Sequence, residues 1–309
     1  MPSLRRRGRS REAEGTEPAV PWALSALLRD GPAPLEPRAP AGDTLEVVLV
    51  LGPGEDARGV PAEVLEALDP TMVAADEAVD AADADVVLAA GWAAAPAVLT
   101  LEGVRARAVL ATAEPAPLAE LGWTAGVPVL GPSWLGGTLP PGADAGYAPM
   151  PVHRREDLVL IHGEEPLGLL AAAELHARRD DLGFAVSGAR PGLVLPFPFL
   201  GVAAGTAALA HAFASATVAL APPVRGWRPA ALAMLACGQA VVAPDDQAAR
   251  AALGDAASLA ASPVAAADAA LALVDDLGLR ATRARAGFAR VSGGWDRTAA
   301  ALLDEVRAL

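Results

Sequence analysis

The sequence lacks several residue types almost completely. Its 309 residues include no lysine, no asparagine and a single isoleucine, Ile161, whereas alanine, glycine, proline and arginine are abundant. This imbalance is typical of a coding sequence of very high GC content, as in a GC-rich bacterium. Part of the alanine content then reflects the genome, so helix propensity alone overstates the amount of helix.

Cysteine is nearly absent as well. With Cys237 as the only one, the chain can form no internal disulfide, which fits a reducing compartment, and we expect a cytoplasmic protein. Cys237 stands at the end of an expected helix. A small buried hydrophobic side chain is the more common role for such a residue than a reactive thiol.

Positive charge is scarce. The formal net charge is −13 and the pI is near 4.7. Because phosphate neutralisation needs clustered cations, this composition argues against nucleic-acid binding. A basic cluster at the N-terminus, MPSLRRRGRSR, could associate with anionic lipid, although a solvated tail is the default interpretation.

Long uninterrupted apolar runs are also missing, so no segment predicts a transmembrane span. The apolar run at 19–28 is short and is not followed by a small-residue cleavage site, so we predict no signal peptide. A hydrophobic content of 53% with 20% charged residues is typical of a folded protein. The length favours two domains over one.

Strand-like and helix-like segments alternate along the chain, which favours an α/β fold of parallel β-α-β units. Residues 1–44 predict a tail, and the turn formers PPGADAGYAPM at 140–150 predict a linker between domains at 45–139 and 151–293. Two Rossmann-like domains would face each other across a cleft, where we expect the ligand. The predicted strands are 45–51, 85–90, 106–111, 127–130, 158–162, 184–187, 217–221, 240–243 and 257–260.

The most informative stretch, residues 221–246, reads APPVRGWRPAALAMLACGQAVVAPDD. Its prolines and glycines fit a loop, a short helix and a buried parallel strand, and a loop that opens onto a helix start can bind an anion. Arg225 and Arg228 flank Trp227 in this loop. They are candidates for a phosphate clamp, with solvated surface arginines as the alternative.

Several motifs of catalytic and metal sites are absent. The sequence has no Gly-x-Ser-x-Gly elbow, no P-loop and no HExxH pattern. Asp245 and Asp246 have no further ligand at metal spacing, and an aspartate at the N-cap of the following helix explains the pair better. We therefore expect no metal and no cofactor.

The second half of the chain resembles the nucleotide-sugar-binding domain of family 4 glycosyltransferases, which have the two-Rossmann GT-B fold. The matching segments are ATVALAPP, LAMLACG, QAVVAPD and LRATRARAGFARVSGGWDRTAAALLDEV. In the first half, ADADVVLAAGW, AVLATAEP and AGVPVLGPSWL resemble the branch that includes rhamnan-synthesis transferases. The resemblance implies retaining transfer of a sugar from a nucleotide-sugar donor to a glycan or small-molecule acceptor, without a metal. It also implies that residues 294–309 form a helix that crosses back to the first domain.

The chain departs from this family where the donor would be held. The family has a basic pair after the first strand of the second domain, where this chain has Gly163 and Glu164 followed by a second glutamate. The family's two glutamates around the helix fall on Arg225 and Ala233 here. Both carboxylates are thus missing, and an acidic pair at the other position would repel a diphosphate at close range.

The donor-side candidates are grouped near the expected cleft. His162 ends a strand there and could donate to a phosphate or a sugar, with a structural histidine as the alternative. Glu114, from a Glu-Pro pair that the family shares, would face the acceptor, although a loop carboxylate without a partner fits equally well. The donor-side candidates are His162, Gly163, Glu164, Arg225, Trp227 and Arg228; no catalytic residue is assigned.

Two functions from different classes follow from these observations. A divergent active transferase would hold the donor phosphates with Arg225, Arg228 and helix-terminal amides. A catalytically inactive homologue would keep the fold as a scaffold that binds a partner protein or a glycan, and the missing glutamates motivate this alternative. A third, weaker possibility is a sugar or nucleotide sensor with its hinge at 140–150.

Overall fold

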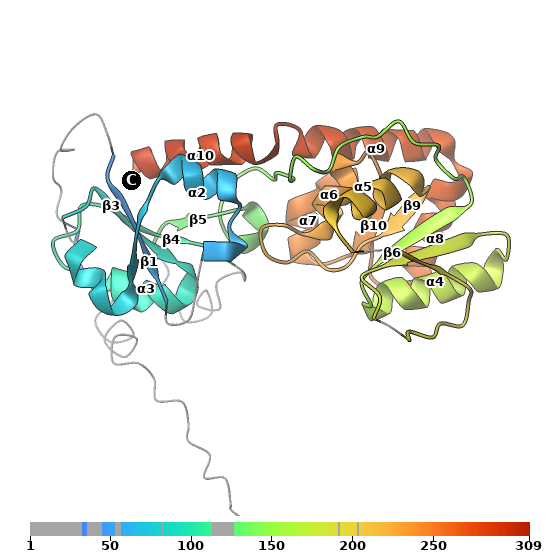
Figure 1. Ribbon diagram of the computed structural model, residues 1–309, viewed down its shortest axis with the longest axis horizontal. Coiled ribbons are helices and arrows are strands. Elements are labelled where there is room, and N and C mark those ends of the chain that lie inside the picture. Colours follow the sequence, from blue (N-terminus) through green and yellow to red (C-terminus); the bar gives the residue numbers. More distant parts are fainter. Residues whose placement is uncertain are drawn as a thin grey trace, which may run out of the picture.

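The computed structural model describes residues 33–35, 45–52, 57–81, 83–112, 127–190, 192–202 and 204–309. These residues form two α/β domains side by side, with the C-terminal helices running along one edge of both (Figure 1). The predicted α/β architecture of two Rossmann-like domains is confirmed. No helix in the described ranges combines the length and the apolar character that crossing a bilayer requires.

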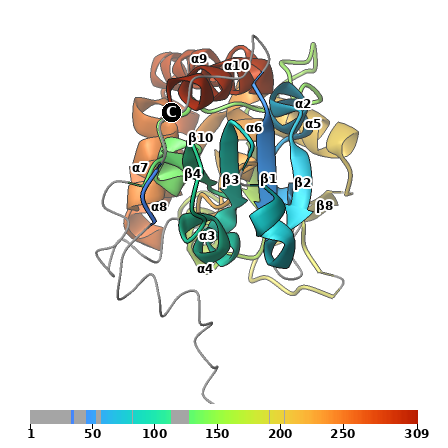
Figure 2. The same cartoon turned by 90° about the vertical axis from the view of Figure 1, so that its left-hand side faces the viewer.

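The first domain is built on a parallel sheet in the order β2-β1-β3-β4-β5 (Figure 2). Its three central strands are almost fully buried and, apart from Arg107 at the start of β4, apolar, as expected for parallel strands covered on both faces. The strands are β1 (Val47–Leu51), β2 (Thr71–Ala74), β3 (Val86–Ala90), β4 (Arg107–Leu110) and β5 (Val129–Leu130). The helical segments are η1 (Ala57–Gly59), α2 (Ala62–Leu68), η2 (Ala75–Ala81), α3 (Gly91–Leu99) and η4 (Ser133–Leu135).

The second domain has a parallel sheet in the order β11-β10-β9-β6-β7-β8. Alternate residues of β6 face opposite layers: Val159 and Ile161 pack with α4 and α8, whereas Leu160 belongs to the core on the side of α5 and α6. The strands are β6 (Leu158–His162), β7 (Gly183–Ser187), β8 (Leu200–Val202), β9 (Val218–Leu220), β10 (Ala240–Pro244) and β11 (Ser258–Ala260). The helical segments are α4 (Pro166–Arg178), α5 (Thr206–Ser215), α6 (Ala230–Ala236), α7 (Gln247–Leu253), η5 (Gly254–Ala256), α8 (Pro263–Asp275) and α9 (Leu277–Val291).

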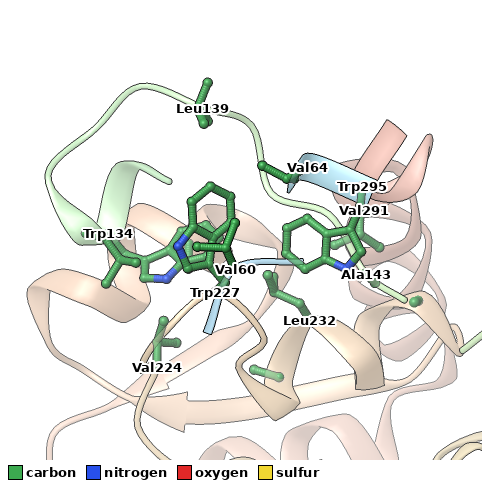
Figure 3. Close-up of a cluster of buried hydrophobic side chains, with 14 of the residues drawn as sticks. Val60, Val64, Trp134, Leu139, Ala143, Val224, Trp227, Leu232, Val291 and Trp295 are labelled. Carbon is green, nitrogen blue, oxygen red and sulfur yellow. The ribbon is translucent and has the colours of Figure 1, made fainter. Parts of the chain in front are cut away.

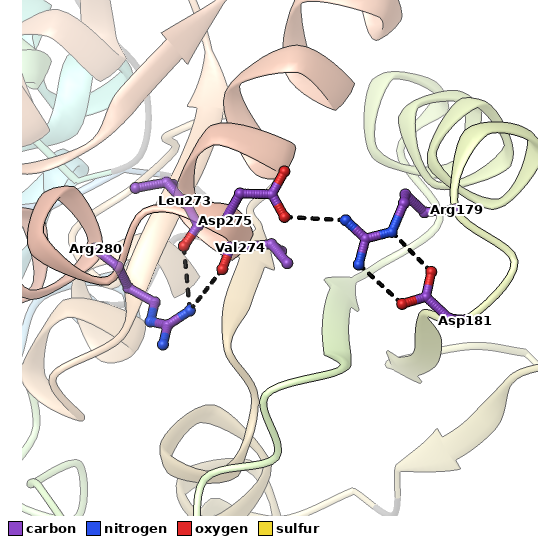
Figure 4. Close-up of polar contacts among 6 residues, drawn as sticks. All are labelled: Arg179, Asp181, Leu273, Val274, Asp275 and Arg280. Carbon is purple, nitrogen blue, oxygen red and sulfur yellow. Dashed lines mark hydrogen bonds and ion pairs between the residues drawn. The ribbon is translucent and has the colours of Figure 1, made fainter.

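Arginine side chains fasten the helices on the outer face of this domain (Figure 4). The last carbonyls of α8 have no partner within the helix, and the buried guanidinium of Arg280 donates to two of them, Leu273 at 3.3 Å and Val274 at 3.1 Å. Arg179, just after α4, binds Asp181 and also Asp275 at the end of α8. The neighbouring ends of α4 and α8 are thereby tied together.

The chain crosses twice between the domains, and the two crossings lie against each other. Residues 140–150 lead from the first domain to β6 without regular structure, and α10 (Gly294–Ala308) leads back to pack on α2. Trp295 and Thr298 of α10 donate to the Asp144 carboxylate at 2.7 Å and to the Pro140 carbonyl at 3.0 Å. Side chains at the start of α10 therefore hold the first crossing in place.

Some elements differ from the sequence-based prediction. The strands β2 and β8 were not predicted, because both are short edge strands with mostly exposed residues and no buried apolar run. After β5, the residues around Trp134 form only a single 3-10 turn between Pro132 and the left-handed Gly136. The other predicted strands are present with small shifts at their ends.

Candidate functional site

Three tryptophans close the space between the two domains (Figure 3). The loop after β9 carries Trp227, which is 1% exposed and donates from Nε1 to the carbonyl of Ala111 in the first domain at 2.6 Å. In return, Trp134 of the first domain donates to the carbonyl of Gly226 at 2.7 Å. Trp295 packs 6.2 Å from Trp227, centroid to centroid. At this seam one buried hydrophobic cluster contains residues of both domains.

Beside the seam lies a pocket of about 200 Å³. Its floor is the N-terminal half of α6, and its walls come from the first crossing, the end of β6, α5 and the start of α10. Aromatic and apolar groups make up most of the lining, with one acidic, one basic and one imidazole side chain among them. The residues that matter below are Asp144, Tyr147, His162, Phe213, Arg228, Ala233 and Trp295.

His162 lines this pocket at the carboxyl end of β6. Its Nδ1 lies 2.7 Å from the Ser187 hydroxyl, and its ring packs edge-on against Phe213 with the centroids 5.8 Å apart. Burial disfavours the charged imidazolium and lowers the pKa of His162 below its ordinary value. The side chain is therefore neutral at pH 7 and presents a polar ring without charge to the pocket.

Arg228 also reaches the pocket, but its charge is already matched. Its Nε lies 3.1 Å from Oδ1 of Asp144, which also accepts the Trp295 indole hydrogen bond, and its Nη2 lies 3.9 Å from Oε2 of Glu63 on α2. Arg225 is exposed on the preceding part of the loop and forms no ion pair in the described part of the chain. The structure thus brings only one of the two predicted clamp arginines to the pocket.

Glu164 and Gly163 lie beside the pocket rather than in its lining. Gly163 has a φ of 78°, and its backbone N–H donates to the Ser187 carbonyl at 2.8 Å. The Glu164 carboxylate accepts the Arg190 backbone N–H at 2.6 Å and lies 3.3 Å from the Arg190 side chain. This position therefore carries a carboxylate that is engaged with its own loop.

Ala233, at the position of the family's second glutamate, faces the pocket from α6. Among the lining residues Asp144 is the only carboxylate, and it comes from the first crossing rather than from the helix. Trp227, another donor-side candidate, lies in the seam between the domains. Glu114, the acceptor-side candidate, falls outside the described residues.

The remaining sequence candidates have structural roles. The Asp246 side chain caps α7 by accepting the Ala249 N–H at 2.7 Å, while Asp245 pairs with Arg250 at 2.7 Å. Within the ranges that the structure describes, no three potential ligands gather as a metal site would require. Cys237 is 2% exposed, and burial raises the pKa of its thiol to about 11, so it is an inert core residue.

Sequence reasoning missed most of the residues that line the pocket. Asp144 and Tyr147 belong to the crossing that the sequence presents as a spacer, and Phe213 is one of many apolar residues on α5. The only available signal was the presence of an aspartate and the chain's single tyrosine within a segment otherwise made of small residues and proline.

The comparisons with known proteins identify the fold. No family model and no curated protein sequence matches the chain. Its structure is similar to that of HepE from Anabaena, solved in complex with UDP, with a TM-score of 0.59 and 14% identity over 85% of this chain and 99% of that one. It is similar to AviGT4, a glycosyltransferase involved in avilamycin A biosynthesis (TM-score 0.55, 15% identity, 86% and 98% covered). It is also similar to sucrose-phosphate synthase from Thermosynechococcus elongatus (0.54, 11%, 85% and 98%). At these identities the likeness establishes a shared GT-B fold.

Proposed function

We propose that this protein is a catalytically inactive homologue of the GT-B glycosyltransferases that serves as a binding protein for a glycan or a partner protein. The segments that resemble family 4, including its rhamnan-synthesis branch, support descent from that family. The observation that carries the proposal is the content of the pocket. Ala233 faces it in place of a carboxylate, and the one arginine that reaches it is already paired with Asp144 and Glu63.

The electrostatics around the pocket disfavour a nucleotide diphosphate. Binding one would bring negative charge next to Asp144, Glu63 and Glu164, and it would compete with these carboxylates for Arg228 and Arg190. Oxyanion-stabilising groups assist catalysis only when they are free to meet the developing charge. With both guanidiniums engaged, the leaving diphosphate would find little stabilisation.

The contacts between the two domains also support an inactive homologue. A transferase of two domains needs space between them for donor and acceptor. Here the indoles of Trp134 and Trp227 each donate a hydrogen bond to a backbone carbonyl of the opposite domain, and both rings belong to one buried cluster. Such an arrangement suits a rigid body that presents fixed surfaces. A reducing compartment, the cytoplasm, is part of the proposal because the only cysteine is a buried free thiol.

The proposal is tested by titrating the full chain with UDP-glucose and GDP-mannose in a calorimeter and by assaying release of UDP or GDP with a panel of sugar acceptors. We expect neither binding heat nor turnover. Sugar transfer by the isolated chain would refute the proposal.

A divergent active transferase is the second candidate, favoured by Arg228 and the neutral His162 at one pocket. It requires that donor binding depend on the loop arginines. Binding that is lost in the Arg225→Ala, Arg228→Ala double variant, but kept in Arg250→Ala, would select this candidate. Arg250 is a fair control because it is an exposed arginine on α7, away from the pocket, and is paired with Asp245.

A further inference from the structure

We propose that the pocket beside α6 binds a single uncharged sugar ring, either a free monosaccharide or the terminal unit of a glycan. The inference rests on the proposed function, because it names the ligand class of the same pocket. It depends on three properties of the lining, which are its size, its charge and the chemistry of its exposed groups.

The size of the pocket selects a small ligand. Pockets for drug-sized molecules usually measure about 300–1,000 Å³. This one measures about 200 Å³ and ends at the buried indole of Trp295 and the ring of Phe213. One six-membered sugar ring fits this space.

The charge of the lining selects a neutral ligand. Arg228 and Asp144 are the only two charged residues that line the pocket, and they form an ion pair with each other. His162 is uncharged at pH 7 because burial lowers its pKa. An anion would be repelled by Asp144 and by Glu63, which lies near Arg228, and a cation would be repelled by Arg228. A neutral polyol is repelled by neither charge.

The exposed groups suit hydroxyls on one side and C–H faces on the other. Both the Trp295 indole and Arg228 bind Oδ1 of Asp144, so Oδ2 makes no hydrogen bond within the described residues. Nε2 of His162 is likewise without a hydrogen bond there, because Nδ1 meets Ser187. These groups can exchange hydrogen bonds with sugar hydroxyls, and those to the ionised carboxylate are the stronger ones.

The apolar side of the lining completes the site. Tyr147 stacks on Phe213 at a centroid distance of 5.8 Å, and the two rings together with Trp295 form an aromatic wall. The floor is the methyl group of Ala233 and its apolar neighbours on α6. A glutamate at position 233 would fill this floor, so the loss of that carboxylate is also what opens the room for a ring.

The test uses free sugars and the full chain. Glucose, galactose, mannose, rhamnose and N-acetylglucosamine are titrated while ligand-observed NMR and tryptophan fluorescence are recorded. We expect at least one of them to bind with a dissociation constant on the order of 1 mM, as is reasonable for so small a contact. Absence of saturable binding by all five at about fifty times that concentration would overturn the proposal.

A matched pair of variants locates the binding. Ala233→Leu reduces the pocket and should weaken binding at least tenfold, whereas Ala300→Leu on the exposed face of α10 should leave it unchanged. Asp144→Asn, which removes the charge but keeps an acceptor oxygen for Trp295, should also weaken binding. If sugar binding is equally strong in Ala233→Leu, with its thermal midpoint unchanged, the ligand sits elsewhere and the proposal is wrong.

The outcomes keep the two proposals apart. Turnover of a nucleotide sugar would refute the inactive-homologue function whatever the free sugars do. Failure of all free sugars to bind, with no donor binding either, would refute the sugar pocket and leave the inactive scaffold intact.

Discussion

Gly142 lies directly beneath the indole of Trp295. A Cβ atom at position 142 would stand 2.6 Å from Cε3 of that ring and 2.8 Å from the carbonyl oxygen of Gly294. The first crossing and the start of α10 thus touch at a residue without a side chain. This contact sets how closely the two crossings between the domains can approach each other.

Replacing this glycine should destabilise the protein. We expect Gly142→Ala to lower the free energy of unfolding by about 1–3 kcal/mol, because both obstacles are rigid and buried overpacking has this cost. Urea denaturation measures the change. Gly201→Ala is the control, since the added Cβ meets nothing within 4 Å; an equal loss in both variants would contradict the explanation.

The hydrogen bond of Trp227 across the seam gives a second prediction. Trp227→Phe leaves the Ala111 carbonyl buried without its donor and should cost about 1–3 kcal/mol. Trp92→Phe is a matched control, because the Trp92 indole N–H is buried and donates to no group in the described structure. If Trp92→Phe were less stable than Trp227→Phe in the same denaturation experiment, the stabilising role of the Trp227 hydrogen bond would be contradicted.

His162 should make stability depend on pH. Its pKa is depressed by burial in the folded protein, so between that value and the ordinary one, about 6.5, the unfolded state binds more protons. The stabilisation is complete above the ordinary pKa and declines as the pH falls through it. The charged groups that line the same pocket, Asp144 and Arg228, are paired with each other.

Denaturation midpoints at pH 7.5 and 5.5 measure this effect. We expect the difference between the two midpoints to shrink in His162→Gln and to persist in His153→Gln, where the histidine is exposed outside the pocket. An unchanged pH dependence in His162→Gln would show that other groups are responsible.

The two aspartates after β10 allow the energetic contribution of a helix N-cap to be compared with that of an exposed ion pair. Asp246→Ala removes the side chain that accepts the Ala249 N–H and should cost about 0.5–2 kcal/mol, the usual value of an N-cap. Asp245→Ala breaks only an exposed pair with Arg250 and should change the unfolding free energy much less. The reverse order of the two effects would argue against the capping role.

Much of the fold could be predicted because its buried central strands appear in the sequence as continuous apolar runs. The runs VVLVL, VVLAA and LVLIH are apolar at every position, except for the terminal His162, as strands covered on both faces must be. The edge strands β2 and β8 carry no such signal, since pairing on one side and exposure on the other allow almost any residue.

The site could be predicted less completely, for a related reason. His162 was found because it ends an apolar predicted strand, and Ala233 was found because the family resemblance places a glutamate at its position. Asp144 joins the pocket through Trp295, 151 positions later in the chain, and through its ion pair with Arg228, and no local pattern encodes either contact. The loop containing Trp227 was correctly placed beside a helix start, but its burial depends on the opposite domain and could not be inferred from the loop itself.

The position of α10 has a consequence for biosynthesis. This helix covers α2 of the first domain, yet the ribosome makes it only after the entire second domain. At ordinary rates of translation, synthesis of the second domain and of α10 takes on the order of ten seconds after the first domain has been made. During that interval the apolar surface meant for α10 is open to chaperones, and the nascent first domain is complete only when the final residues of the helix emerge.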